Sequence, residues 1–154
     1  MKKLLLLVLL LTSTTAHSAE GTLRGLDVIN VVIENLDDGA TSCGITKESI
    51  RVAAESPLSQ SRIRVVENRG GSKGYVYVQV TMLFLENTWC AYSVNVQFKS
   101  PATLKSNNAY VVGSIWNRSF LGAASRSIAA RKVSNSVKER TNEFIIEWTR
   151  DNPR

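Results

Sequence analysis

The chain has 154 residues, 44% of them hydrophobic, and a formal net charge of +6. This length suits one domain with a hydrophobic core of its own. The charge is too small to indicate a dedicated nucleic-acid-binding protein.

Residues 1–18 have the three-part layout of a secretory signal peptide. Two lysines precede the apolar run of residues 4–11, and small residues precede a cut near Ser18. The apolar run is far shorter than the roughly 20 residues of a transmembrane helix. A cut after Ala19 and a retained membrane anchor both stay open. We predict a periplasmic or secreted protein whose single domain is residues 19–154.

Removal of this segment would also change the chemistry open to the protein. The segment contains His17, the only histidine, so the mature chain would have no imidazole for catalysis or metal binding. Loss of its lysines would lower the net charge from +6 to about +4. We therefore expect no cofactor, no metal site, no nucleic-acid partner and no enzymatic activity.

The two cysteines, Cys43 and Cys90, form an isolated pair. In an oxidising compartment such a pair usually forms a disulfide, and the spacing does not fit a CxxC redox motif. Counted inclusively, the closed loop would contain 48 residues. We predict a structural disulfide, with free buried thiols or an intermolecular bridge as alternatives.

The first elements of the mature chain are a strand and a helix. Residues 26–36 are rich in β-branched side chains and predict a central strand, which turn residues at 37–39 close. Thr46 is a good N-cap for the helix that follows. Pro57 lies inside its apolar stripe and should kink or end the helix near Ser56.

A long hairpin is the clearest pattern in the chain. It follows a short predicted strand at residues 62–67 and a glycine-rich turn at 68–74. Residues 75–86 and 89–99 alternate between apolar and other side chains, and residues 87–88 reverse the direction. The alternation predicts one apolar face and one polar–aromatic face.

The C-terminal part predicts a polar loop at residues 101–108, a fifth strand at 109–116 and a helix at 123–150. The order is β-α-β-β-β-β-α. We predict an α+β fold, a two-layer sandwich with a mostly antiparallel sheet of about five strands and two helices on one face. The helical stripe consists of Ala130, Val133, Val137, Phe144, Ile145 and Trp148.

The second face of the hairpin is the candidate binding surface, because aromatic side chains and amides alternate along it. It would be exposed if both helices cover the opposite face. Loops or residues 19–25 could instead cover it. The candidate residues are Tyr75, Tyr77, Gln79, Trp89 and Asn95.

Two other groups of side chains suggest alternatives. Carboxylates could act as acid and base in a hydrolase of envelope glycans, if two of them face each other across a cleft. The long helix is basic and could touch anionic lipid headgroups, although a solvated face is the favoured interpretation. The acids are Asp27, Glu34, Asp37 and Asp38, and the helix cations are Arg126, Arg131, Lys132, Lys138 and Arg140.

The layout from Cys43-Gly44-Ile45-Thr46, through the hairpin, to Trp89-Cys90-Ala91-Tyr92 and the long helix resembles that of small uncharacterised exported bacterial α+β proteins. The resemblance covers most of the mature chain and implies no activity. We therefore predict a non-catalytic binding or accessory protein, whose partner could be another envelope protein and whose oligomeric state is open. An enzyme inhibitor is a further alternative, with a protruding loop at residues 69–73 or 101–108.

Overall fold

The computed structural model describes residues 21–67, 72–85 and 88–154. Two helices, one short and one long, follow the first strand, and a third closes the domain. The elements are β1 (Val28–Ile33), α1 (Asp38–Ser42), α2 (Lys47–Ser59), β2 (Arg64–Val65), β3 (Tyr75–Leu85), β4 (Trp89–Thr103), β5 (Tyr110–Ser125) and α3 (Arg126–Asp151).

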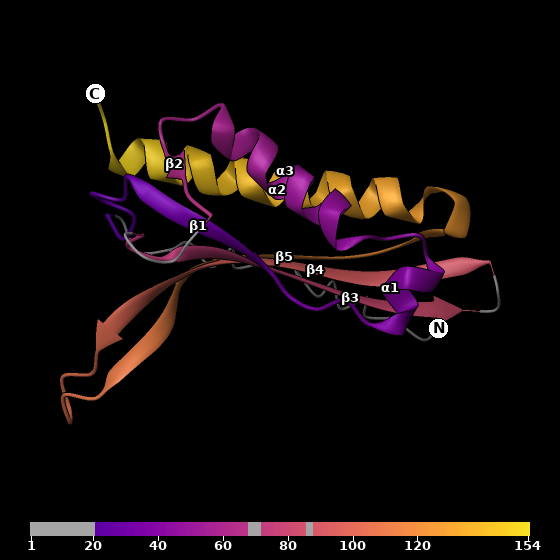
Figure 1. Cartoon of the computed structure of the whole chain (residues 1–154), viewed down its shortest axis with the longest axis horizontal. Helices are drawn as coiled ribbons and strands as arrows, with labels where there is room; N and C mark the ends of the chain where they lie inside the picture. The colour runs from indigo at the N-terminus through magenta and orange to yellow at the C-terminus, as the bar shows by residue number, and fades with distance from the viewer. Residues whose placement is uncertain (1–20, 68–71, 86–87) are drawn as a thin grey trace, which may run out of the picture.

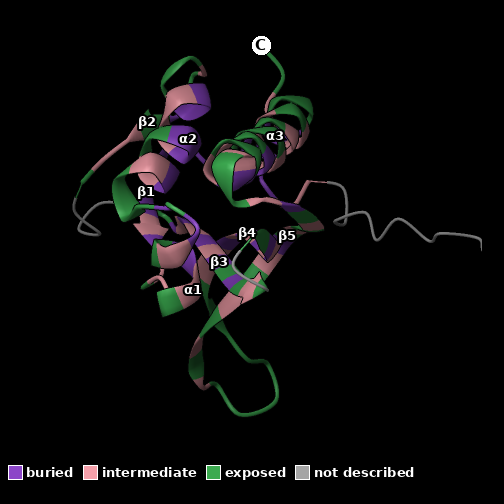
Figure 2. Cartoon of the chain, turned by 90° about the vertical axis from the view of Figure 1, so that its right-hand side faces the viewer, coloured by how far each residue is buried: buried purple, intermediate pink, exposed green. Residues whose placement is uncertain are grey.

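The strands form one 5-stranded sheet in the order β2-β1-β3-β4-β5. β1 runs parallel to both of its neighbours, whereas β3, β4 and β5 are antiparallel. Both long helices, α2 and α3, lie on the same side of this sheet (Figures 1 and 2). The predicted α+β two-layer sandwich is therefore confirmed, with a mixed sheet whose parallel pairs are short.

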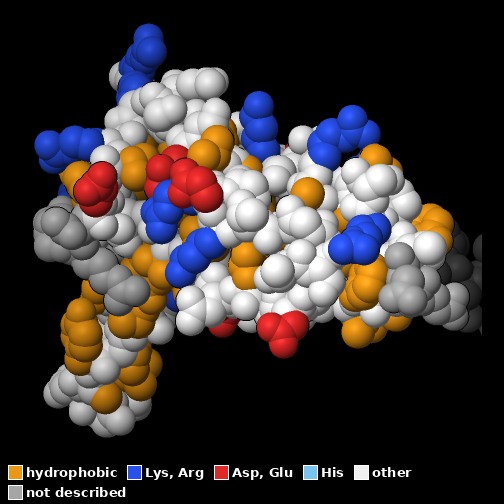
Figure 3. All heavy atoms as spheres, turned by 45° about the vertical axis from the view of Figure 1, so that its right-hand side comes forward, with side chains coloured by type: hydrophobic (Ala, Val, Ile, Leu, Met, Phe, Trp, Pro, Cys, Tyr) orange, Lys and Arg blue, Asp and Glu red, His pale blue; other side chains and the backbone are white. Residues whose placement is uncertain are grey.

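β4 and β5 continue beyond the rest of the sheet as a hairpin arm, residues 99–114. The register shifts between Phe98 and Lys99, and such a β-bulge bends a hairpin. The arm projects to the side opposite α2 and α3 (Figure 1), and hydrophobic side chains line it (Figure 3). The predicted polar loop over residues 101–108 is therefore wrong in its bounds, since β4 runs to Thr103 and β5 begins at Tyr110.

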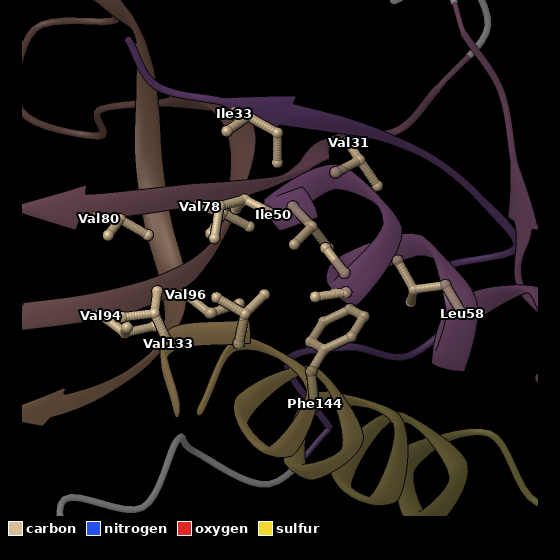
Figure 4. Close-up of a cluster of buried hydrophobic side chains, with 14 of the residues drawn as sticks. Val31, Ile33, Ile50, Leu58, Val78, Val80, Val94, Val96, Val133 and Phe144 are labelled. Atoms are coloured by element: carbon tan, nitrogen blue, oxygen red, sulfur yellow. The ribbon is translucent and has the colours of Figure 1, made fainter. Parts of the chain in front are cut away.

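The core fills the space between the sheet and the two long helices (Figure 4). Every second residue is buried from Val76 to Met82 in β3 and from Cys90 to Phe98 in β4, which matches the alternation of side chains along a strand. These side chains meet the apolar stripes of α2 and α3. The residues drawn in this cluster include Val78, Val80, Val94, Val96, Ile50, Leu58, Val133 and Phe144.

Residues 37–39 do not form the predicted turn but begin α1. Asp37 is the N-cap, and its Oδ1 accepts a hydrogen bond of 2.8 Å from the backbone N–H of Ala40. Its Oδ2 accepts one of 3.0 Å from the backbone N–H of Met82 in β3. β1 pairs with β3 only as far as Val78. The Asp37 carboxylate therefore accepts the hydrogen bond of a β3 backbone N–H that lies beyond the end of β1.

α2 begins where the sequence predicts but ends later. Thr46 is its N-cap, and Ser49 completes a reciprocal capping box. The helix continues past Pro57 to Ser59. A proline removes one backbone donor, which would bond the carbonyl of Ala53, and the helix ends within the same turn. The predicted end near Ser56 is therefore wrong by a few residues.

The boundary between β5 and α3 also differs from the prediction. β5 runs to Ser125, and α3 begins at Arg126 rather than at residue 123. Ala124 pairs with Cys90 in β4, and Ser125 pairs with Trp89. Alanines favour helices, but pairing across the sheet outweighs this weak local preference.

The end of α3 is fastened to the start of the described chain. The Asp151 Oδ2 accepts a hydrogen bond of 3.1 Å from the N–H of Leu23, and Asp151 is buried. The Asn152 side chain accepts one of 2.7 Å from the N–H of Gly25 and donates one of 2.9 Å to the carbonyl of Leu23. Residues 23–25 are therefore part of the folded domain.

Candidate binding surface

The face of the sheet that points away from α2 and α3 is the open face. Side chains on β3 and β4 that alternate with the core residues point to it. All five candidate residues lie there, and Trp89 is exposed whereas the other four are half-buried. The five are Tyr75, Tyr77, Gln79, Trp89 and Asn95.

The strand register divides these five residues between the two ends of the open face. Gln79 lies directly opposite Asn95, two residues along β3 from Tyr77. Trp89 lies opposite Leu85, ten residues along β3 from Tyr75. At about 3.4 Å per residue this distance is about 34 Å. The structure therefore brings four of the residues together and leaves Trp89 at the far end.

The polar end of the open face is built around Tyr77. Its ring lies 6.3 Å from that of Tyr75 in an edge-to-face arrangement, and the Nζ of Lys99 lies 3.7 Å from its centroid. Burial raises the pKa of the Tyr77 phenol, and the nearby Glu34 carboxylate raises it further. Tyr77 therefore remains a neutral hydrogen-bonding group at neutral pH.

The other end of the open face is apolar. Leu83 is 61% exposed, Trp89 53% and Leu121 78%. Leu83 lies opposite Ala91 in β4, which in turn lies opposite Ala123 in β5, so small apolar side chains fill the space between the larger ones. A contiguous exposed apolar patch of this kind is typical of an interaction site.

The leucines of this apolar end were not among the predicted surface residues. Leu83 and Leu85 occupy the same alternate positions of β3 as Tyr75 and Tyr77, so the alternation could have identified them. Leu121 lies between the predicted fifth strand and the predicted helix. It joins the open face only because β5 continues through it.

Two of the four candidate acids, Asp37 and Asp27, have structural partners in this fold. The Asp37 carboxylate accepts hydrogen bonds from the backbone N–H groups of Ala40 in α1 and Met82 in β3. Asp27 forms an ion pair of 3.0 Å with Lys73, and the hydrogen bond and charge of that lysine lower the pKa of Asp27 despite a smaller opposing effect of burial. Within the described ranges, no group of three histidine, cysteine or acidic side chains could hold a metal ion.

A hollow of about 610 Å³ lies beside the disulfide, between α1 and the start of α3. Arg126 borders it, donates a hydrogen bond of 2.8 Å to the carbonyl of Ser42 and lies over the Phe84 ring. Hydroxyl groups supply most of the other polar side chains of the lining, which offers no acid–base pair. The lining includes Thr41, Ser42, Thr88, Ser125, Arg126 and Ser127.

The basic side chains of α3 fall into two classes. Arg140 is held by Glu143 at 3.0 Å, and Arg126 by the contacts just described. Arg131, Lys132 and Lys138 are exposed. Contact of this helix with anionic lipid headgroups stays a prediction.

The predicted disulfide is present. Cys43 and Cys90 are bonded, with their Cα atoms 6.3 Å apart, and both are buried. The bond ties the C-cap of α1 to β4. Disulfides are typical of exported proteins. The predicted signal peptide and its cut near Ser18 lie outside the described residues.

Two expectations concern loops and membrane spans. Of the loops proposed for an inhibitor, residues 69–71 lie outside the described residues, whereas residues 101–108 form the outer part of the hairpin arm. Among the described helices, none combines the length and the hydropathy needed to cross a membrane.

Comparisons with known proteins leave the family open. No family model matches the chain, and no curated protein matches its sequence. Lipoprotein GNA1162 from Neisseria meningitidis shares 12% identity over 78% of this chain and 98% of its own, with a TM-score of 0.44. The uncharacterized lipoprotein B from Nitrosomonas europaea shares 12% over 79% and 81%, with a TM-score of 0.34. At these scores the likeness supports no argument about function, which therefore has to come from the surface itself.

Proposed function

We propose that the protein is a small exported binding or accessory protein without catalytic activity, and that the open face binds another protein of the cell envelope. One observation supports this most directly. α2 and α3 cover the same side of the sheet, so that the opposite side presents exposed aromatic and aliphatic side chains.

The apolar end suits a protein partner better than a small molecule. Trp89, Leu83 and Leu121 stand on a sheet rather than in an enclosed cavity, and small-molecule sites are concave. Large side chains surrounded by polar ones are typical of the centre of a protein–protein interface. Thr81, Ser93 and Asn95 supply polar neighbours on the same face. We expect Trp89 to contribute most of the binding energy.

The test is a quantitative pull-down from envelope extract with Trp89→Ala/Tyr77→Ala. We expect this variant to fold and to lose at least about tenfold in recovery of a specific partner, which corresponds to about 1.4 kcal/mol. Val52→Ala/Ile146→Ala is the control, because it removes exposed apolar side chains from the helical side.

Equal recovery of every partner by the folded open-face variant and the wild type would contradict this function. Equal losses in the open-face and control variants would mean that the capture is nonspecific, which would also contradict it.

An enzyme inhibitor is the second candidate, and the projecting hairpin arm favours it. Protruding loops on a rigid scaffold are suited to insertion into an active site. The outer arm carries Lys105 as its one charged side chain. In this case, shortening the turn at residues 104–109 would abolish inhibition and leave binding by the open face unchanged.

A further inference from the structure

The hairpin arm leaves apolar side chains in water on both of its faces. Tyr110 is 73% exposed, Val112 51% and Leu104 44%. Lys99 pairs with Ser114 at the base of the arm, and Thr103 pairs with Tyr110 near its tip. In the described part of the chain no helix covers the arm (Figure 2). A two-stranded ribbon without a covering layer is only marginally stable in water.

The two edges of the arm differ in how well they resist pairing with another strand. Along β4, the residues beyond Lys99 no longer pair with β3, and Pro101 protects this free edge, since proline cannot donate a backbone hydrogen bond to an added strand. Along β5, residues 110–115 contain neither a charge nor a proline. Among the described strands, β5 pairs only with β4. The outer edge of β5 is therefore the side of the arm open to a partner strand.

A lipid bilayer does not suit a single arm. A strand that enters hydrocarbon must have all of its backbone N–H and C=O groups bonded, and the outer edge of β5 would leave half of its groups unbonded. A partner strand satisfies these groups directly.

We propose that the partner is a second copy of this chain, joined by antiparallel pairing of the two β5 strands about a two-fold axis at Val112. In this register Val112 lies opposite Val112 of the second copy, and Tyr110 lies opposite Ser114. The two arms then form a continuous four-stranded sheet. Three or more strands are what a sheet needs for independent stability.

Charge supports pairing between identical strands. Residues 106–117 contain no charged side chain. With the axis at Val112, Lys105 lies opposite Ser119 of the second copy, and Arg118 lies opposite Ser106. Arg118 is also held by Glu147 of α3 within its own chain. Repulsion between like charges is the usual obstacle to pairing two copies of one strand. In this register no two like charges lie opposite each other.

The first test measures mass by sedimentation equilibrium from about 1 to about 500 μM, the range suited to a small interface. The protein is expressed from the full 154-residue sequence and kept oxidised. We expect the wild type to shift from one-chain to two-chain mass. Val112→Lys should remain at one-chain mass throughout. Val52→Lys is the matched control, because Val52 is 56% exposed on α2, and it should behave as the wild type.

The second test locates the axis with single cysteines. Both natural cysteines are bonded to each other, so an added thiol has no natural partner in the described chain. Residues directly opposite in antiparallel strands have Cα atoms about 4.5–5.5 Å apart, which a disulfide can span. We expect Val112→Cys to form a covalent dimer on mild oxidation. Tyr110→Cys and Ser114→Cys should crosslink weakly alone and strongly when mixed.

A wild type that keeps one-chain mass at every concentration would overturn the proposal. So would a Val112→Cys yield no greater than that of Val52→Cys. A dimer that Val112→Lys leaves intact would place self-association elsewhere, and would overturn it as well.

Discussion

Asp151 is a charged residue on the buried side of α3, with 4% of its surface exposed. Burial alone would raise the pKa of its carboxyl group. The backbone N–H groups of Leu23 and Gly21 and the Arg150 guanidinium outweigh that effect, and they lower the pKa below its ordinary value of 3.8. The ionised form is therefore the one that the fold stabilises.

Asp151→Asn should lower the free energy of unfolding by about 2 kcal/mol at pH 7, because a charge-assisted hydrogen bond is weakened. A lowered pKa in the folded state means that this contribution is present above pH 3.8 and is lost as pH falls further. Urea unfolding of both proteins at pH 7 and at lower pH measures it. The control Asp38→Asn removes an exposed carboxyl group, and should cost less than about 1 kcal/mol. A difference that is the same at every pH would contradict this account.

At the scale of the element, α2 depends on its reciprocal N-terminal cap. Thr46→Ala removes the side-chain acceptor of the Ser49 N–H and should destabilise the protein by about 1 kcal/mol. Thr149→Ala is the control, because Thr149 is an exposed threonine in the last turn of α3, and it should change stability by less than about 0.5 kcal/mol. Chemical denaturation measures both. Equal effects would mean that the cap contributes nothing specific.

Elements with a strong period could be predicted, and those decided by pairing could not. The alternation of residues 75–86 identified β3 almost to the residue. The Thr46 cap identified the start of α2. In contrast, the last residues of β5 look helical, and only their register with β4 makes them a strand. The local sequence around Asp37 predicts a turn. Its hydrogen bond from the backbone N–H of Met82 in β3 depends on the tertiary fold and could not be predicted.

At the scale of the molecule, the disulfide joins the C-terminal end of α1 to the start of β4. Cys43→Ala/Cys90→Ala should lower the free energy of unfolding by about 2–4 kcal/mol, because the oxidised unfolded chain contains a closed loop. Thermal melting with and without reductant measures it. The double variant should be insensitive to reductant, whereas the wild type should melt lower when reduced. An unchanged melting temperature in the reduced wild type would contradict the prediction.

The aromatic and amide residues of the candidate surface were predictable, but Leu121 and the shape of the surface were not. Alternation placed Tyr75, Tyr77 and Gln79 on one face. Only the register shows that Trp89 lies about 34 Å from Tyr75. The hairpin arm depends on a bulge after Phe98, which appears only when the register of β4 against β5 is known. Long-range pairing decides these features, and local sequence preferences do not encode it.

The contacts between residues 23–25 and the end of α3 set an order of events during synthesis. Leu23 is 128 positions from Asp151, so the ribosome must have made almost the whole described chain before these contacts can form. Until then the first residues of the domain have no native partner at that site. The hydrogen bonds between residues 23–25 and the end of α3 are therefore absent through most of translation. Contacts between residues so far apart in the sequence slow folding, because a long loop must close before they can form.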